Sequence, residues 1–227
     1  MRILNNRAIF FVITFLVSLL FTKYYFLFTH EHYEPASTER MSEFAADKVF
    51  QKRVLPILLA NFTINLTGLS LDHVIKVFCV LSCIALLYGF RDLLDESSPN
   101  APAGLAFLVI VPVGWNYIAL NGIYHTYDIP ALAFFCWGLV LFLRKRFVLF
   151  YAIYILAGLN RESTCFITIA IFSLGLRIPE PKNFMHVFIQ NLFKTNKHLL
   201  LHCVIQMLLW FSNKFGLEYF FRNSPGN

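Results

Sequence analysis

The chain has 227 residues, of which 58% are hydrophobic and 14% are charged, and its formal net charge is +6. A soluble domain would carry about a quarter charged residues, so this composition excludes an ordinary soluble domain. It predicts an all-α, multi-pass transmembrane helical bundle whose first partner is the lipid bilayer. The basic residues are scattered between apolar runs and not gathered on one face, which argues against binding to nucleic acid.

The first apolar run, 8–28, follows the basic start MRILNNR. A signal peptide has a similar pattern, but no small-residue cleavage site follows promptly. The run is long enough to cross a membrane if Lys23 extends outward along its aliphatic stem, so we expect a retained first span. The segment 29–70 is expected to form an outer loop. Its apolar part, 54–70, carries Asn61 and Asn65 one helical turn apart, which favours a helix lying at the membrane interface.

The remaining spans are expected at 71–90, 103–118, 128–144, 147–159, 163–176 and 198–215. Ser70 and Asp72 are typical of a helix start and place the beginning of the second span. Pro112 and Gly114 are expected to kink the third span. The segment 183–197 has basic and apolar residues on opposite sides, which predicts an amphipathic helix on the inner membrane surface.

The distribution of Lys and Arg sets the expected orientation, since cytoplasmic loops carry an excess of both residues. With about seven spans and a cytoplasmic N-terminus, ten of the 19 Lys and Arg lie inside, seven lie outside, and Lys23 and Lys76 fall within spans. If 54–70 crossed the membrane instead, the basic turn 144–146 would face outward, against this rule. We therefore expect one membrane domain over 1–227 with about seven spans.

Three polar segments then meet on the outer face: the acidic first loop, the turn 125–128, and the turn 160–162. A carboxylate can act as general base toward a sugar hydroxyl, an arginine can hold a phosphate, and a second carboxylate can hold a divalent metal ion. These are the requirements of sugar transfer from a lipid phosphate. The candidate catalytic residues are Glu43, Asp47, Asp128 and Glu162, and the candidate substrate-binding residues are Arg53, His125, Tyr127, Asn160 and Arg161.

Each of these residues also has a structural interpretation. Asp128 precedes Ile129 and Pro130, a pattern typical of a helix N-cap. Arg161 and Glu162 could pair with each other, or simply lie in water at a loop between two short spans. Most of the first-loop acids would belong to a solvated surface.

Three short motifs carry a resemblance to a known family: VFQKRVLP at 49–56, YDIPALAFF at 127–135 and LNRES at 159–163. Together with the acidic outer loop they resemble bacterial members of the GT-C superfamily, polytopic glycosyltransferases that use polyprenyl-phosphate sugars. The resemblance implies sugar transfer at the outer face of a bacterial inner membrane. It also implies a catalytic base among the first-loop acids and, as in some members, a divalent metal ion as cofactor.

The chain departs from that family in two residues and in length. Lys52 replaces a frequent aromatic residue, and Ser163 replaces a common threonine. The end of the chain, 220–227, resembles a loop after which relatives continue, so we expect a truncated member or the N-terminal part of a longer module. The alternative is a small non-catalytic membrane protein that acts as a scaffold or as an assembly partner of other membrane proteins. A transporter is less favoured, because the chain shows no internal repeat.

Overall fold

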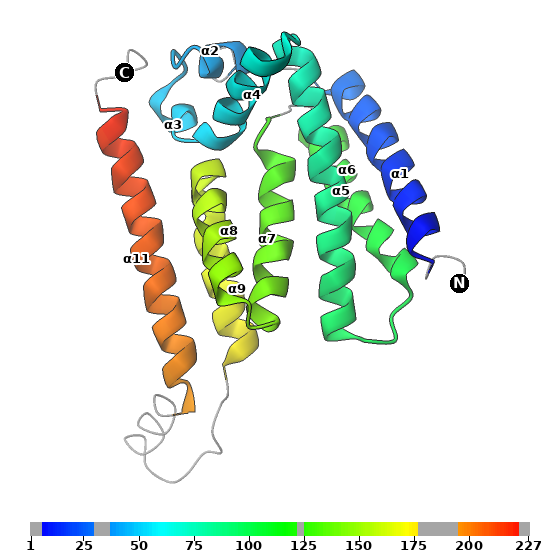
Figure 1. Ribbon diagram of the computed structural model, residues 1–227, viewed down its shortest axis with the longest axis vertical. Helices are drawn as coiled ribbons and strands as arrows, with labels where there is room; N and C mark the ends of the chain where they lie inside the picture. Colours follow the sequence, from blue (N-terminus) through cyan, green and yellow to red (C-terminus); the bar gives the residue numbers. More distant parts are fainter. Residues whose placement is uncertain (1–5, 30–36, 122–124, 177–194, 223–227) are drawn as a thin grey trace.

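The computed structural model describes residues 6–29, 37–121, 125–176 and 195–222, and these ranges contain helices and no strand. The expected all-α fold is confirmed. The helices that run along the bundle in Figure 1 include α1 (Arg7–Phe28), α5 (Leu71–Ser97), α7 (Asp128–Leu143), α8 (Phe147–Asn160), α9 (Cys165–Gly175) and α11 (Lys197–Phe220). The amphipathic helix expected at 183–197 lies outside the described residues except for its last three.

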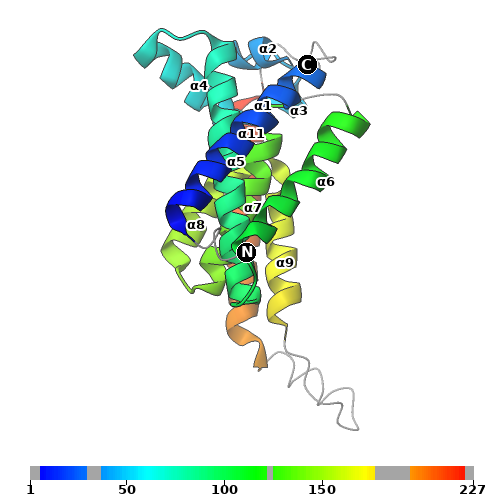
Figure 2. The same cartoon turned by 90° about the vertical axis from the view of Figure 1, so that its right-hand side faces the viewer.

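Consecutive long segments run in opposite directions. The beginning of α8 packs against the end of α7, where the rings of Phe150 and Phe142 lie 5.4 Å apart. The end of α8 returns to the start of α7, where the Asn160 side chain donates a hydrogen bond to the Tyr127 carbonyl. Figures 1 and 2 show the same alternation along the bundle, with the beginning of α1 and the end of α11 at opposite ends.

The segment Ala103–Asn121 is irregular along its whole length. It consists of a 3-10 helix η3 (Ala103–Val109), a short α6 (Ile110–Gly114) and a π-helical η4 (Trp115–Asn121). Pro112 removes one backbone hydrogen bond and crowds the preceding turn, which explains a local distortion. The departure from α-helix begins before that residue, however, and so exceeds the kink expected at Pro112 and Gly114.

Three short helices cover one end of the bundle, and we call residues 37–68 the cap. They are α2 (Thr38–Ser42), α3 (Lys48–Gln51) and α4 (Val54–Thr67). In Figure 1 the cap lies over α7 and α8, whose upper ends stop short of the upper ends of α1 and α5. Met41, Ala46 and Ile57 pack with Tyr127 in one apolar cluster, so the cap is fastened to the turn that precedes α7.

α5 begins at Leu71 with Ser70 at its N-cap position, as predicted, but it continues to Ser97 and not to residue 90. The added turns are polar, and they are held by Arg144 at the end of α7. Its guanidinium bonds Asp92 and Glu96, each at 2.7 Å. The helix can therefore extend beyond its apolar part because its acidic residues have a cation to bind.

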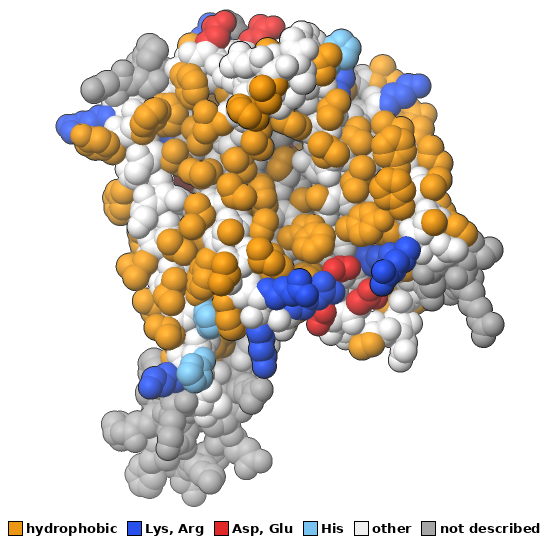
Figure 3. All heavy atoms as spheres, in the orientation of Figure 1, with side chains coloured by type: hydrophobic (Ala, Val, Ile, Leu, Met, Phe, Trp, Pro, Cys, Tyr) orange, Lys and Arg blue, Asp and Glu red, His pale blue; other side chains and the backbone are white. Residues whose placement is uncertain are grey.

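An apolar surface covers the middle of the bundle on one face. Figure 3 shows hydrophobic side chains over the centre of one face, with charged side chains along the cap edge and in a row toward the other end. Among the described residues, Arg7–Phe28, Leu71–Ser97 and Ala103–Leu120 are long and apolar enough to cross a membrane. The protein therefore has the composition and helices of a membrane protein.

Two glycines give a matched test of helix packing. A Cβ at Gly89 in α5 would lie 3.0 Å from Trp137 in α7, and the Trp137 ring is held by a 2.8 Å hydrogen bond to the Ala85 carbonyl. A Cβ at Gly216 in α11 would meet nothing within 4 Å.

We therefore expect Gly89→Ala to lower the free energy of unfolding by about 1–2 kcal/mol, since the cost of overpacking exceeds the gain in helix propensity. Gly216→Ala should raise it by about 0.5–1 kcal/mol through that same propensity. Thermal unfolding in detergent measures both changes. Equal effects of the two substitutions would contradict the packing described for α5 and α7.

Candidate functional site

A buried ion pair lies at the cap end of the bundle. The guanidinium of Arg161 donates a hydrogen bond of 2.6 Å to the Asp128 carboxylate, whose residue is only 3% exposed. Asp128 is the first residue of α7, and Arg161 directly follows α8. Both structural interpretations made from the sequence are corrected here. Among the described residues Arg161 forms an ion pair with Asp128 and none with Glu162, and the N-cap residue of α7 is Tyr127.

Tyr127 lies at the centre of a cluster that also contains Arg53, His125 and Arg161. The guanidinium carbon of Arg53 lies 4.1 Å from the centre of the Tyr127 ring, and that of Arg161 lies 5.6 Å from it. The ring of His125 stacks on Tyr127 at 5.1 Å. Burial raises the pKa of the Tyr127 phenol to about 12, so the phenol stays neutral at physiological pH. The ring therefore offers the two cations a neutral face to lie on.

Arg53 is a cation placed to bind an anion. It occupies the N-cap position of α4, and it also lies over the ring of Phe50, at 5.0 Å. Burial lowers its pKa, although Tyr127 and Asp128 oppose this effect. Within the described residues Arg53 forms no ion pair. A half-buried guanidinium that rests on aromatic rings is a suitable site for a phosphate or carboxylate ligand.

Asn160 joins the cluster to a cavity. The residue is fully buried, and its side-chain nitrogen donates a 2.9 Å hydrogen bond to the Tyr127 carbonyl. Its side-chain oxygen is buried without a protein partner. Because buried polar atoms are normally hydrogen-bonded, this oxygen is a candidate contact for a ligand group.

Two cavities lie on different sides of α7. The larger, about 480 Å³, is enclosed by α1, α4, α5, α7 and α8, and its polar lining includes His125, Thr126 and Asn160. Most of its remaining lining is apolar. The smaller, about 260 Å³, is bordered by both Asp128 and Arg161. His125 and Asn160 therefore line an apolar cavity, whereas Asp128 and Arg161 line a smaller cavity that is more polar.

Of the other predicted residues, Glu162 follows Arg161 and its charge acts on Arg53, whereas Glu43 and Asp47 belong to the ends of short cap helices. Glu43 is exposed at the end of α2, and its neighbour Phe44 stacks on Phe221 at 6.1 Å, on the side of the cap that meets the end of α11. Asp47 is the N-cap residue of α3. The Glu162 carbonyl accepts a hydrogen bond of 2.8 Å from Trp210.

The sequence did not single out Tyr25, Phe50 or Tyr117. The Tyr25 hydroxyl accepts a 3.3 Å hydrogen bond from the His125 amide, and Tyr117 lines the smaller cavity. Tyr25 could have been recognised from its position near the end of the apolar run 8–28. A phenol hydroxyl in such a position needs a polar partner, which indicates a nearby polar site.

The described residues do not fit the expected divalent metal ion. Within them, no group of three or more His, Cys, Asp or Glu side chains lies close enough to hold one. The Asp128 carboxylate already binds Arg161, which leaves it a poor metal ligand.

Comparison of the chain with family models, with curated proteins and with solved structures finds no match. What the protein does is therefore inferred from the geometry of Arg53, Tyr127, Asp128, Asn160 and Arg161 and from the two cavities beside them.

The ion pair gives a test of stability. Arg161→Met removes the cation and leaves Asp128 buried and unpaired, so we expect a loss of about 2 kcal/mol. This is less than for a fully buried pair, because 35% of the Arg161 side chain is exposed. Asp128→Asn keeps a hydrogen-bond acceptor and should cost about half as much.

The measurement is unfolding of the purified protein in detergent, with the double variant completing a mutant cycle. Additive losses in that cycle would show that the two side chains do not interact.

Proposed function

We propose that this chain is a GT-C-like membrane glycosyltransferase that takes a sugar from a polyprenyl-phosphate donor at the capped end of the bundle. One observation carries the proposal: Arg53, Arg161 and Asp128 meet around Tyr127, and His125 and Asn160, which contact Tyr127, line an apolar cavity of about 480 Å³. A lipid phosphate needs both a cationic site and an apolar channel. The quoted motifs support the same class of donor.

Arg53 would hold the phosphate. Its guanidinium offers several N–H donors, and it has no ion pair among the described residues to compete with the ligand. The first isoprene units would enter the cavity beyond His125 and Asn160, against Leu55 and Phe134. The unpartnered Asn160 oxygen could accept a hydrogen bond from a donor hydroxyl at the cavity wall.

Asp128, the first residue of α7, would act as general base where an acceptor in the smaller cavity meets the donor head over the start of that helix. The acceptor hydroxyl oxygen forms a bond to the anomeric carbon of the donor sugar, and the bond from that carbon to the phosphate oxygen breaks. The hydroxyl proton moves to Asp128, and polyprenyl phosphate leaves with its charge held by Arg53. Arg161 orients the carboxylate through its 2.6 Å contact.

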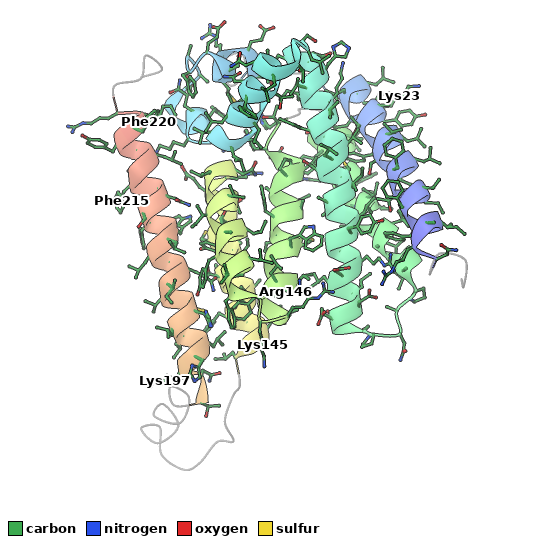
Figure 4. All side chains as sticks on the ribbon, in the orientation of Figure 1. Lys23, Lys145, Arg146, Lys197, Phe215 and Phe220 are labelled. Atoms are coloured by element: carbon green, nitrogen blue, oxygen red, sulfur yellow. The ribbon has the colours of Figure 1, made fainter. Side chains whose placement is uncertain are left out.

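The membrane arrangement belongs to the same proposal. The long segments α1, α5, Ala103–Asn121, α7, α8, α9 and α11 would make seven crossings, with the cap on the outer side and its helices at the interface. Figure 4 supports this orientation, because Lys145 and Arg146 between α7 and α8, and Lys197 at the start of α11, all lie toward the end opposite the cap. Cytoplasmic ends of membrane helices are enriched in such residues. The membrane would be a bacterial inner membrane, with the N-terminus in the cytoplasm.

A non-catalytic scaffold is the second candidate. It is favoured by the burial of Asp128 and its pairing with Arg161, which would also be expected of a contact that only fastens α7 to α8. It is favoured too by the exposure of Glu43 away from the cluster. If the protein is a scaffold, Arg53→Gln and Asp128→Asn would change its stability and have no effect on lipid binding or sugar transfer.

Binding of undecaprenyl phosphate to the purified full chain in lipid nanodiscs tests the proposed function. Arg53→Gln should weaken binding about tenfold or more, because a charge-assisted contact to the phosphate is lost. Arg40→Gln, an exposed arginine of the same cap, should leave binding unchanged. Asp128→Asn should bind the lipid but stop transfer to an acceptor. Absence of binding by the unmodified chain would favour the scaffold.

Cysteine labelling tests the orientation. In a variant without the five native cysteines, Glu43→Cys and Lys145→Cys should react with a membrane-impermeant maleimide from opposite sides of spheroplasts. We expect labelling at position 43 in intact cells and at position 145 only after the membrane is opened. Both side chains are exposed, so burial does not limit the reaction. Labelling of both positions in intact cells would contradict the arrangement.

A further inference from the structure

A third cavity, distinct from the two on either side of α7, lies between α1 and α5. It measures about 540 Å³, and its apolar lining includes Leu19, Leu27, Val77 and Val80. Lys23 and Lys76 also line it. It does not include Arg53, Asp128 or Arg161, so it is separate from the proposed catalytic site.

The two lysines lie in the cap half of this groove, where Phe26 and Leu27 follow Lys23 on α1. Lys23 is exposed near the upper end of α1, as Figure 4 shows, and it forms no ion pair among the described residues. The Lys76 ammonium bonds Asp72 at 2.6 Å and lies 5.8 Å from the centre of the Phe26 ring. Two ammonium groups and one carboxylate give this part of the groove a net charge of +1.

The apolar part of the groove extends from the lysines toward the middle of the bundle. Leu19 precedes Lys23 by one turn of α1, and Val80 follows Lys76 by one turn of α5, which runs in the opposite direction. Both residues therefore lie on the inner side of the charges. The groove thus combines a cationic end with an apolar length, on two helices that are long and apolar enough to cross a membrane.

We propose that this groove binds one anionic glycerophospholipid of the outer leaflet, with its phosphodiester between Lys23 and Lys76 and one acyl chain beside Leu19 and Val80. A lysine on a lipid-facing helix is costly unless its ammonium reaches the level of the headgroups and finds a counter-charge there. A phosphodiester supplies that charge at that depth. The net charge of +1 favours a lipid whose headgroup is anionic over one whose headgroup is zwitterionic.

Free phosphate has the same charge chemistry, but it would leave the apolar length of the groove unused. The experiment therefore separates a lipid from a soluble anion. Delipidated full-length protein in detergent is titrated with phosphatidylglycerol and with phosphatidylcholine of identical acyl chains, and bound lipid is counted by native mass spectrometry. Inorganic phosphate is added as a competitor.

The expected result is tighter binding of phosphatidylglycerol than of phosphatidylcholine. The double variant Lys23→Gln, Lys76→Gln should weaken phosphatidylglycerol binding about tenfold or more, whereas Lys145→Gln with Arg146→Gln, a matched loss of two charges at the opposite end, should not. Asp72→Asn should strengthen binding about threefold or more, because it removes the only carboxylate that bonds Lys76 among the described residues.

The single variant Lys23→Gln leaves the Lys76–Asp72 ion pair intact. It therefore still tests lipid binding if the double variant does not fold. Melting temperatures are recorded for every variant. Unchanged phosphatidylglycerol binding in Lys23→Gln and in the double variant, or no gain in Asp72→Asn, would overturn the proposal. Displacement of the lipid by inorganic phosphate at equal concentration would also overturn it, because the groove would then bind phosphate alone.

Discussion

The contact between Asp128 and Arg161 is the constraint on which the capped end of the bundle depends. It joins the first residue of α7 to the residue after α8, with a carboxylate that is almost fully removed from water. A buried, ionised carboxylate is costly without a close cation, so the Arg161 contact favours the arrangement in which these two helix ends meet. The Asn160 side chain, bonded to the Tyr127 carbonyl, fixes the same junction a second time.

The cap is positioned by its contacts with the junction between the start of α7 and the end of α8. The cap packs on Tyr127 through Met41, Ala46 and Ile57, and it brings Arg53 over the same ring. A salt bridge of 2.9 Å between Lys52 and Glu218 fastens the cap to α11 as well. The cap therefore contacts both the start of α7 and the end of α11. These two contacts hold Arg53 in place although the cap helices are short.

The sequence predicted the architecture better than it predicted contacts. Composition was enough for an all-α fold, because the apolar runs are long and the charges are confined between them. The start of α5 could be located because Ser70 and Asp72 are local signals. The extension of α5 to Ser97 could not, since it depends on Arg144, a residue far along the chain.

For the candidate site too, the sequence indicated the residues but not their contacts. Charged and polar residues in apolar surroundings were detectable one by one, and the structure brings Arg53, His125, Tyr127, Asp128, Asn160 and Arg161 together. The partner of Arg161 was not detectable, because Glu162 is adjacent in sequence while Asp128 is adjacent only in the fold. The cavities and the position of Glu43 likewise depend on tertiary packing, which no local pattern encodes.

The shortness of α8 has a consequence for how a substrate would arrive. Its 14 residues rise about 21 Å, whereas the 22 residues of α1 rise about 33 Å, close to the thickness of a bilayer core. If both begin at the inner interface, Arg161 lies roughly 10 Å below the outer one. A lipid could then reach it sideways through the hydrocarbon without leaving the leaflet.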